Sequence, residues 1–529
     1  MRTMVIRTYL VVALVAVFGT PASVSAQEIL PGAGQQPAVE GPVRRLTADE
    51  AVALALENNL GLKIARVDPQ LQDLNLVAAR TAWAPTVGTQ LQSSSSVQPN
   101  QSFLDGGQGG STSSDGFNSN VTLQQALPWA ASYDVGWSSN RTVTNNTFTN
   151  FSPRLSSNLQ LNYSQSLLRN FSIDGTRQQI QQGELQREMA DVSLREQIAV
   201  TSRTVRNAYW DLAYAVESLA VAQQSLELAE EQLRNTQARV KIGTTPPIDV
   251  VQDQSEVASR REAVILAEAQ IATAEDALRV LVFDPTSPDF WTARIETTEL
   301  PAFEPVPVDV EAAVRNALDR RTDLENTRTQ LDISDIGIRY QRNQTLPDVS
   351  ASFNYRVSGV GGTQIMREGG GIFDPGGVVT TTESSRSFGT VLGDILKSEY
   401  PSWTASIDIS YPLGTSSAQA NLARARLERS QAETQLQQQE LQISQQVRQQ
   451  ARNVQTNEQR VQTTQVARQL SERRLEAERQ KLDAGTSTNY LVTQAQRDLA
   501  NALNAELQAV LDYYRSLVDL QTVQEVPLR

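Results

Sequence analysis

Hydrophobic residues recur every seven positions through two long stretches, around residues 205–282 and 447–520. In the first stretch a small residue follows each large one three positions later, as Ala215 follows Leu212. This is the a/d pattern of a coiled coil, in which small d residues let helices approach closely. The other positions carry Gln, Glu, Arg and Asn, as solvated helix faces do. The pattern predicts long paired helices, the first beginning near Gly175.

Each half of the chain interrupts its long helical pattern at a Gly-Thr turn, Gly243-Thr244 and Gly485-Thr486. Glycine takes the left-handed conformation that ends many helices without steric cost. The hydroxyls of the Thr and Ser residues after each glycine are expected to cap the next helix. The two turns are therefore predicted to be the tips of two long antiparallel helical hairpins.

The two halves of the chain also resemble each other in sequence. Residues 51–66 align with residues 313–328 at an offset of 262, which also pairs Pro85 with Pro347. Further on, the offset falls to 242 and pairs the two turn glycines. These offsets predict a tandem duplication in which the first half is longer by 20 residues. Because long paired helices tolerate insertions poorly, the surplus is expected in loops or strands.

Between the short and the long helices the hydrophobic period changes to two. Trp403 and Tyr411 lie on the apolar side of one such segment, and Phe353 and Tyr355 on that of another. Alternation over about ten residues, with aromatic residues near the ends, is typical of a membrane β-barrel with a wet interior. We expect these four residues in the aromatic belt of the barrel. The alternative, a soluble sandwich, fits the polar opposite faces less well.

Four barrel strands are expected per chain, joined by external loops at residues 98–120 and 359–377. An additional alternating piece at 121–142 is either an extracellular hairpin, which we favour, or two more barrel strands. Even small barrels use about eight strands, so four strands cannot enclose a pore. Three chains would supply twelve strands, and the strand count therefore predicts an oligomer.

The composition excludes several classes of function. The chain of 529 residues has no Cys and no His, which rules out Ser-His-Asp and Cys-His catalysis and disfavours an ordinary zinc site. Its net charge of −13 disfavours a nucleic-acid partner. We therefore expect no enzymatic activity, no metal and no cofactor.

The N-terminus predicts export. Arg2 and Arg7 precede a short apolar core and a small-residue cleavage site, so residues 1–26 are expected to be a signal peptide. The rest is expected to comprise an N-terminal extension (27–44), a first repeat (45–283), an equatorial linker (284–310), a second repeat (311–524, with strands at about 347–412) and a tail (525–529).

This order of elements, with its paired Gly-Thr turns, resembles the TolC family of outer-membrane efflux and secretion channels over about residues 45–525. The segments "SQSLLRN" and "ISYPLGTSS", where a strand leads into a helix, and "ALDRRTDL", which opens the second half, share the resemblance. The family implies a mixed α/β fold: a homotrimer with a twelve-stranded barrel in the outer membrane of a Gram-negative bacterium and a helical tunnel in the periplasm.

The resemblance also implies a function and partners. The chain would be a passive exit duct driven by an inner-membrane pump of RND, ABC or MFS type, through a periplasmic adaptor. A structural or adhesive coiled-coil surface protein is the alternative, but it would not explain the alternating strands. The expected adaptor-docking residues at the hairpin tips are Val240, Gly243, Thr244, Leu482, Gly485 and Thr486.

The periplasmic entrance departs from the family pattern. Well-known members carry Asp six and nine positions after the second-repeat glycine, where this chain has Leu491 and Gln494. The first repeat instead has Asp249 and, one turn further along, Asp253. Three copies would place these carboxylates around one axis, where like charges draw cations. Asp249 and Asp253 are therefore the expected selectivity ring, and a helix-capping role of Asp249 is the alternative.

Overall fold

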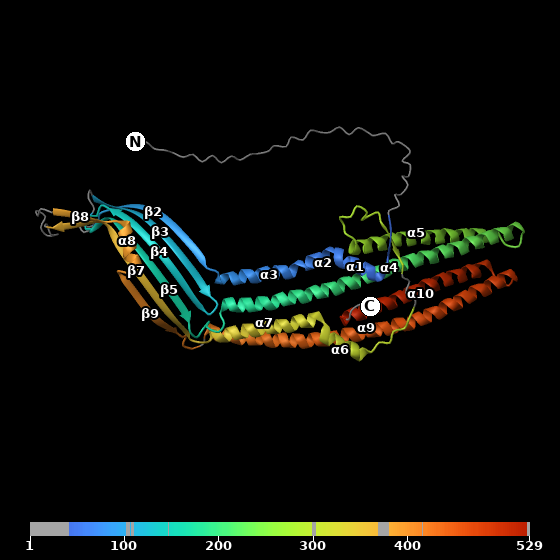
Figure 1. Ribbon diagram of the computed structural model, residues 1–529. Coiled ribbons are helices and arrows are strands. Elements are labelled where there is room, and N and C mark those ends of the chain that lie inside the picture. Colours follow the sequence, from blue (N-terminus) through green and yellow to red (C-terminus); the bar gives the residue numbers. More distant parts are fainter. Residues whose placement is uncertain are drawn as a thin grey trace, which may run out of the picture.

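The computed structural model describes residues 42–101, 106, 110–146, 148–298, 303–368, 380–414 and 416–525. The expected signal peptide, and the extension before residue 42, lie outside the described residues. A twisted antiparallel sheet forms one end of the molecule, and long helices run from it to the opposite end (Figure 1).

Two helical hairpins form most of the molecule's length. Hairpin 1 joins α4 (Gly175–Lys241) to α5 (Ile248–Val282), and hairpin 2 joins α9 (Ser417–Asp483) to α10 (Asn489–Val523). Both α4 and α9 have 67 residues, which at 1.5 Å per residue is about 100 Å. The prediction that the first helix begins at Gly175 is confirmed.

Shorter helices precede the strands in each half. The first half has α1 (Ala48–Asn58), α2 (Leu60–Ala65), α3 (Val67–Arg80) and the 3-10 turn η1 (Thr81–Trp83). The second half has α6 (Val310–Arg320) and α7 (Thr322–Gln344), which begin where the 262-residue offset places them. Because the paired long helices have equal lengths, the surplus residues of the first half lie in its strand region, as predicted.

Near the middle of the rod the short elements pack against the long helices. The parallel strands β1 (Val43–Leu46) and β6 (Arg294–Thr297) pair there, so the expected linker 284–310 contains a strand. Tyr209 of α4 is fully buried and donates its hydroxyl hydrogen to the carbonyl oxygen of Leu46 at 3.1 Å. Tyr513 of α10, also fully buried, accepts a hydrogen bond from the amide of Val306 at 2.9 Å.

The large sheet contains seven strands in the order β2-β3-β4-β5-β7-β8, with β9 also paired to β7. Both β8 and β9 pair with the edge of β7 that faces away from β5. β9 pairs with the first part of β7 and β8 with its last part, so the sheet is six strands wide. The strands are β2 (Thr86–Pro99), β3 (Ser111–Leu127), β4 (Ala131–Thr144), β5 (Phe151–Ser166), β7 (Asp348–Glu368), β8 (Thr380–Arg386) and β9 (Pro401–Ser410).

The expectation of four strands per chain is wrong. β3 and β4 are full members of the sheet between β2 and β5, so the segment 121–142 is not an extracellular hairpin. The expected loops are also shorter than predicted, because β3 begins at Ser111 and β7 continues to Glu368. These segments are rich in Gly, Ser and Asn and therefore resemble loops in sequence, but much of each pairs with a neighbouring strand.

The short helix α8 (Phe388–Leu396), which no sequence pattern predicted, packs on the apolar face of the sheet. Val391 is fully buried there. A Cβ atom at Gly359 would lie 2.7 Å from the Val391 carbonyl oxygen, and one at Gly361 would lie 2.5 Å from its side chain. Glycine at both positions of β7 therefore permits this close approach.

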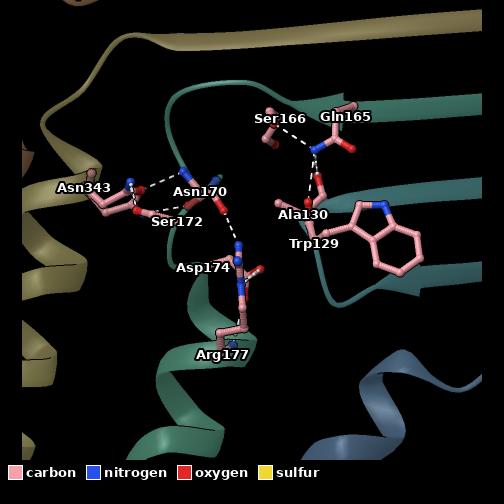
Figure 2. A network of polar contacts seen from close by, with 10 residues as sticks. Trp129, Ala130, Gln165, Ser166, Asn170, Ser172, Asp174, Arg177 and Asn343 are labelled. Atoms are coloured by element: carbon pink, nitrogen blue, oxygen red, sulfur yellow. Dashed lines mark hydrogen bonds and ion pairs between the residues drawn. The ribbon is translucent and has the colours of Figure 1, made fainter.

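A polar network fixes the joint between sheet and helices (Figure 2). The side chain of Asn343, at the end of α7, accepts from the Asn170 amide at 2.6 Å and donates to Ser172 at 3.1 Å. Asp174 caps α4 by accepting from the Arg177 amide at 2.8 Å. The Gln165 amide group donates to the carbonyls of Trp129 and Ala130 at 3.0 and 3.3 Å. The network ties the β3–β4 turn to the end of β5, and α7 to the start of α4.

Candidate functional site

The two hairpin tips have the same backbone geometry. Gly243 and Gly485 have φ values of +79° and +75°, as predicted for left-handed helix ends. The Gly243 amide donates to the Val240 carbonyl at 3.0 Å and the Thr244 amide to the Arg239 carbonyl at 3.0 Å, and residues 481–486 repeat this pattern. Such paired bonds satisfy carbonyls that a helix end leaves unpaired.

The tip threonines act on the helix before them, which corrects the capping prediction. The Thr244 hydroxyl donates to the Arg239 carbonyl at 3.0 Å, and the Thr486 hydroxyl to the Lys481 carbonyl at 3.2 Å. At the start of α5 and α10 no side chain caps the helix. Both hydroxyls thus reinforce the C-terminal end of the incoming helix, where carbonyls need donors.

A buried polar contact joins the two hairpins close to their tips. Asn489, the first residue of α10, donates to Asp253 of α5 at 2.8 Å. Its side-chain oxygen accepts from Gln232 and, at 3.5 Å, from Thr236, both of α4. Asn489 is 7% exposed and Asp253 only 2%. The contact therefore fixes the start of α10 against both helices of hairpin 1.

Burial raises the pKa of Asp253, and the nearby carboxylates of Asp249 and Glu256 raise it further. Hydrogen bonds from Thr236 and Asn489 oppose this rise. A carboxyl whose pKa is raised by folding stabilises the fold while it is protonated. The contribution of Asp253 to stability is complete below the unfolded pKa and is lost as pH rises through the folded value, so burial of this carboxyl costs the fold least under acidic conditions.

An ion pair joins the hairpins about one turn further along. Glu256 of α5, 6% exposed, accepts from Arg497 of α10 through Nε at 2.9 Å and from Arg260 at 2.8 Å. Burial alone would raise the pKa of Glu256, but the hydrogen bond from Arg497 and the charge of Arg260 outweigh burial and lower it. The carboxylate is thus held in its ionised form between two guanidinium groups.

A third contact closes the cluster at the helix ends. Arg239 of α4 pairs with Asp483 of α9 at 2.6 Å. We call Arg239–Asp483, Asp253–Asn489 and Glu256–Arg497 the tip contacts. Together they cross from hairpin 1 to hairpin 2 at three levels. Separating the tips of one chain requires all three to break.

Of the two carboxylates expected at the periplasmic entrance, Asp253 is buried and Asp249 is partly exposed. Asp253 is buried against Asn489, so it is not available in this structure to a ring of solvent-facing carboxylates. Asp249 lies in the first turn of α5 and is partly exposed, and its place in a ring stays a prediction. Leu491 is 41% exposed, and the Gln494 side chain donates to Asp498 at 2.9 Å.

The remaining expected residues lie at the surface of the tips and of the sheet. Gly243, Thr244, Gly485 and Thr486 are exposed, whereas Val240 and Leu482 are partly buried. Among the aromatic residues, Trp403 is opposite Tyr355 across β7 and β9, and Phe353 is opposite Tyr163. Trp403, Tyr411 and Phe353 are exposed. Their role in a membrane belt stays a prediction.

A family model described as "Outer membrane efflux protein" matches the chain twice, over residues 51–282 and 313–523. The chain belongs to the outer membrane efflux protein family. The two matches cover α1 to α5 and α6 to α10, so each contains one helical hairpin and its tip. Among curated proteins, none matches the chain.

Solved structures share the fold of this efflux protein. The crystal structures of CusC have a TM-score of 0.65 at 14% identity and cover 93% of this chain and 95% of theirs. The Campylobacter jejuni CmeC outer membrane channel has a TM-score of 0.60 at 16% identity, covering 90% of this chain and 85% of its own. The outer membrane protein VceC from Vibrio cholerae has a TM-score of 0.60 at 16% identity, and the match covers 90% of this chain and 95% of VceC.

The efflux protein is therefore a protein of the outer membrane with a periplasmic portion, as the sequence predicted. Its family consists of channel proteins rather than enzymes. Within the described part of the chain, no helix has both the length and the apolar composition needed to cross a membrane.

Proposed function

We propose that three copies of this efflux protein form one exit duct, with a barrel in the outer membrane and a helical tunnel in the periplasm. The open sheet is the observation that carries this proposal: one face is apolar and exposed, at Val87, Ile407 and Ile409, and the sheet does not close on itself. Only a closed barrel satisfies every backbone group of a sheet in lipid. A coiled-coil surface protein would leave this apolar face without a partner.

The duct would be passive, because transport through it needs only a continuous aqueous path. Inward-facing polar side chains would line the barrel, and the mostly polar helices α4 and α9 would continue that path for about 100 Å. The energy would come from an inner-membrane pump of RND, ABC or MFS type. No ATP-binding or redox chemistry is needed in this chain.

The helical hairpins offer a surface for the periplasmic adaptor. A groove between α4 and α5 has an apolar stripe, in which Ile265 and Leu266 are more than 60% exposed. The groove is lined by Leu233, Val257, Ala258, Ile265 and Leu266, together with the polar residues Gln254, Arg261 and Glu262. Exposed apolar grooves between helices suit a partner's amphipathic helix. We propose that the adaptor's helices lie in this groove and reach the tips at Gly243 and Gly485.

The tip contacts would hold the duct closed at rest. They join the hairpins of one chain, so breaking them lets one hairpin move away from the other. Glu256 is buried and Arg497 is 46% exposed, so loss of Arg497 costs between the roughly 1 kcal/mol of an exposed pair and the roughly 3–5 kcal/mol of a buried one. Adaptor or pump binding would have to supply free energy of this order to open the tunnel.

The purified efflux protein is expected to have the mass of three chains in mild detergent. Native mass spectrometry of the extracted protein measures this directly, with heat-denatured protein as the single-chain reference. A stable monomer that retains its helix and strand content by circular dichroism would contradict the proposed assembly.

Replacement of Asp249 by Asn is expected to lower the cation selectivity of the reconstituted channel. Three carboxylates near one axis attract cations, and the substitution removes their charge while keeping their size. Reversal potentials in a salt gradient measure the effect, and Glu262→Gln, on the exposed side of the same helix, is the matched control. Equal reversal potentials for wild type and Asp249→Asn would leave helix capping as the role of Asp249.

A further inference from the structure

The sheet of one chain has an open edge at β2 on one side and at β8 and β9 on the other. Among the described residues, β2 and β9 each pair with one neighbour only, and they lie on opposite sides of the sheet (Figure 1). All residues of β2 are exposed, as are nearly all of β9. A six-stranded barrel closed within one chain has too little interior for its own side chains, since eight strands are just enough. The edges therefore need partners from other copies, and the choice of these partners rests on the proposed trimeric duct.

One row of aliphatic and aromatic side chains crosses all six strands, and the next row is interrupted only by Thr89 of β2. The row through β3 and β4 is as apolar as the parts through β5, β7 and β9. A hairpin outside the membrane would have no reason to continue this row. One row consists of Val87, Leu123, Val135, Leu161, Tyr355 and Trp403, and the next of Thr89, Val121, Trp137, Leu159, Val357 and Pro401.

The opposite face is polar in the same six strands. Asp134 of β4 accepts from Asn162 of β5 at 2.8 Å, and Asn162 accepts from Asn354 of β7. This hydrogen-bonded row continues the alternation into β4, where a barrel would have its water-filled interior. β3 and β4 therefore have both faces of a barrel strand, one for lipid and one for water.

The register of the sheet has the stagger that a closed barrel requires. Thr86 is the first residue of β2, and following the paired residues from strand to strand across the sheet leads from Thr86 to Thr404 of β9. Thr404 lies six residues before Ser410, the last residue of β9, so the sheet has a stagger of six residues. If both strand ends lie at one membrane depth, six residues of stagger over six strands give a tilt of about 35°. Membrane barrels have tilts of about 35–45°.

We propose that β9 of each copy pairs antiparallel with β2 of the next, so that three copies close an eighteen-stranded barrel. With the strand ends level, Ser410 lies opposite Thr86, Ile409 opposite Val87, and Ser406 opposite Gln90. This register places apolar side chains beside apolar ones and polar beside polar. A shift by one residue would reverse the faces of the two strands.

An eighteen-stranded barrel also fits the helices that lead into it. Four helices per chain adjoin the sheet, namely α3, α4, α7 and α9, which makes twelve in three copies. Twelve helices about 9 Å apart have a circumference of about 110 Å. A barrel of eighteen tilted strands has a circumference of about 105 Å, and a barrel of twelve has a circumference of about 70 Å. The wider barrel therefore continues the tunnel without narrowing it.

The consequence is a larger permitted cargo. The backbone radius would be about 17 Å, against about 11 Å for twelve strands. With about 5 Å of side chain on the wall, the lumen radius is about 12 Å instead of about 6 Å. The barrel would pass bulky solutes such as oligosaccharides or an unfolded polypeptide, and not only small molecules.

Engineered cysteines test the edge pairing, since the chain has none of its own. The double variant Gln90→Cys/Ser406→Cys should form disulfides between copies under mild oxidation, because opposed residues in antiparallel strands have disulfide-compatible spacing. Covalent dimers and trimers are expected on non-reducing gels. In the control Gln92→Cys/Ser410→Cys the two cysteines are about 20 Å out of register, so this variant should assemble but give only single chains on non-reducing gels.

Native mass spectrometry distinguishes the proposed trimer from the proposed eighteen-stranded barrel. Trimers without cross-linking at positions 90 and 406 would overturn the proposed barrel while leaving the duct in place, whereas absence of trimers would overturn both. The width is tested by adding neutral polymers of about 10 Å hydrodynamic radius on the side of the β2–β3 and β7–β8 connections. Entry, seen as lowered conductance, supports eighteen strands, and exclusion contradicts them.

Discussion

Export is expected to fall at least tenfold when Gly243 or Gly485 is replaced by valine, while the protein still assembles and reaches the outer membrane. Both glycines have φ near +75°, a conformation that a β-branched residue adopts at a cost of about 1–3 kcal/mol. No other atom lies within 4 Å of a Cβ built at either glycine, so the cost comes from the backbone and not from a clash. The tip would refold locally, and the proposed adaptor contact would be lost.

Two control variants isolate the backbone effect. Gly485→Asn should export almost normally, because asparagine tolerates the left-handed conformation. Gly337→Val adds the same side chain in α7, where φ is helical and nothing crowds the Cβ, and should also be tolerated. Cellular export of a pump substrate, with assembled protein quantified in outer-membrane fractions, measures the effect. Normal export by Gly243→Val and Gly485→Val would show that the tips are neither constrained nor contact sites.

Replacement of Arg497 by Glu is expected to open the periplasmic end. The change removes one of the two cations beside the buried Glu256 and adds a like charge. Glu256 is buried but Arg497 is 46% exposed, so the cost of breaking this pair lies between the roughly 1 kcal/mol of an exposed pair and the roughly 3–5 kcal/mol of a buried one. A cost in this range raises the open fraction of the resting channel. The variant should show a higher resting open probability in planar bilayers, and its liposomes should swell faster in permeant solutes.

The matched control lies in the same hairpin. Arg474→Glu breaks an exposed pair with Asp498 inside hairpin 2, where such pairs contribute less than about 1 kcal/mol, so conductance should not change. The neutral double variant Glu256→Gln/Arg497→Gln should leak less than Arg497→Glu, because no charge is then buried without a partner. If Arg497→Glu conducts like wild type, the ion pair does not hold the tip closed.

Local sequence signals predicted the helical part of the fold well. The heptads, the start of α4 at Gly175 and the left-handed Gly243 and Gly485 each depend on residues close in the chain. β3 was obscured because Ser111–Asn120 resembles a polar loop, and its strand character depends on pairing with β2 and β4. The four-strand expectation failed for this physical reason: strand pairing is non-local.

The same distinction applies to the candidate site. Asp253 was found by its spacing from the tip, but its burial depends on Asn489, which lies 236 residues further along the chain. Glu256 and Arg497 were missed because each resembles an ordinary charge on a solvated helix face. Only the packing of α5 against α10 brings them together. The duplicated plan predicted two helical hairpins with tips of the same kind, but not which side chains join them.

The most direct test of the duct is the current through single purified assemblies in a planar lipid bilayer. A passive duct should give discrete steps of uniform conductance at fixed voltage without any nucleotide, and larger or more frequent steps for Arg497→Glu. A preparation of intact trimers that inserts into the bilayer but carries no current, both as wild type and as Arg497→Glu, would contradict the claim that this protein encloses a water-filled path.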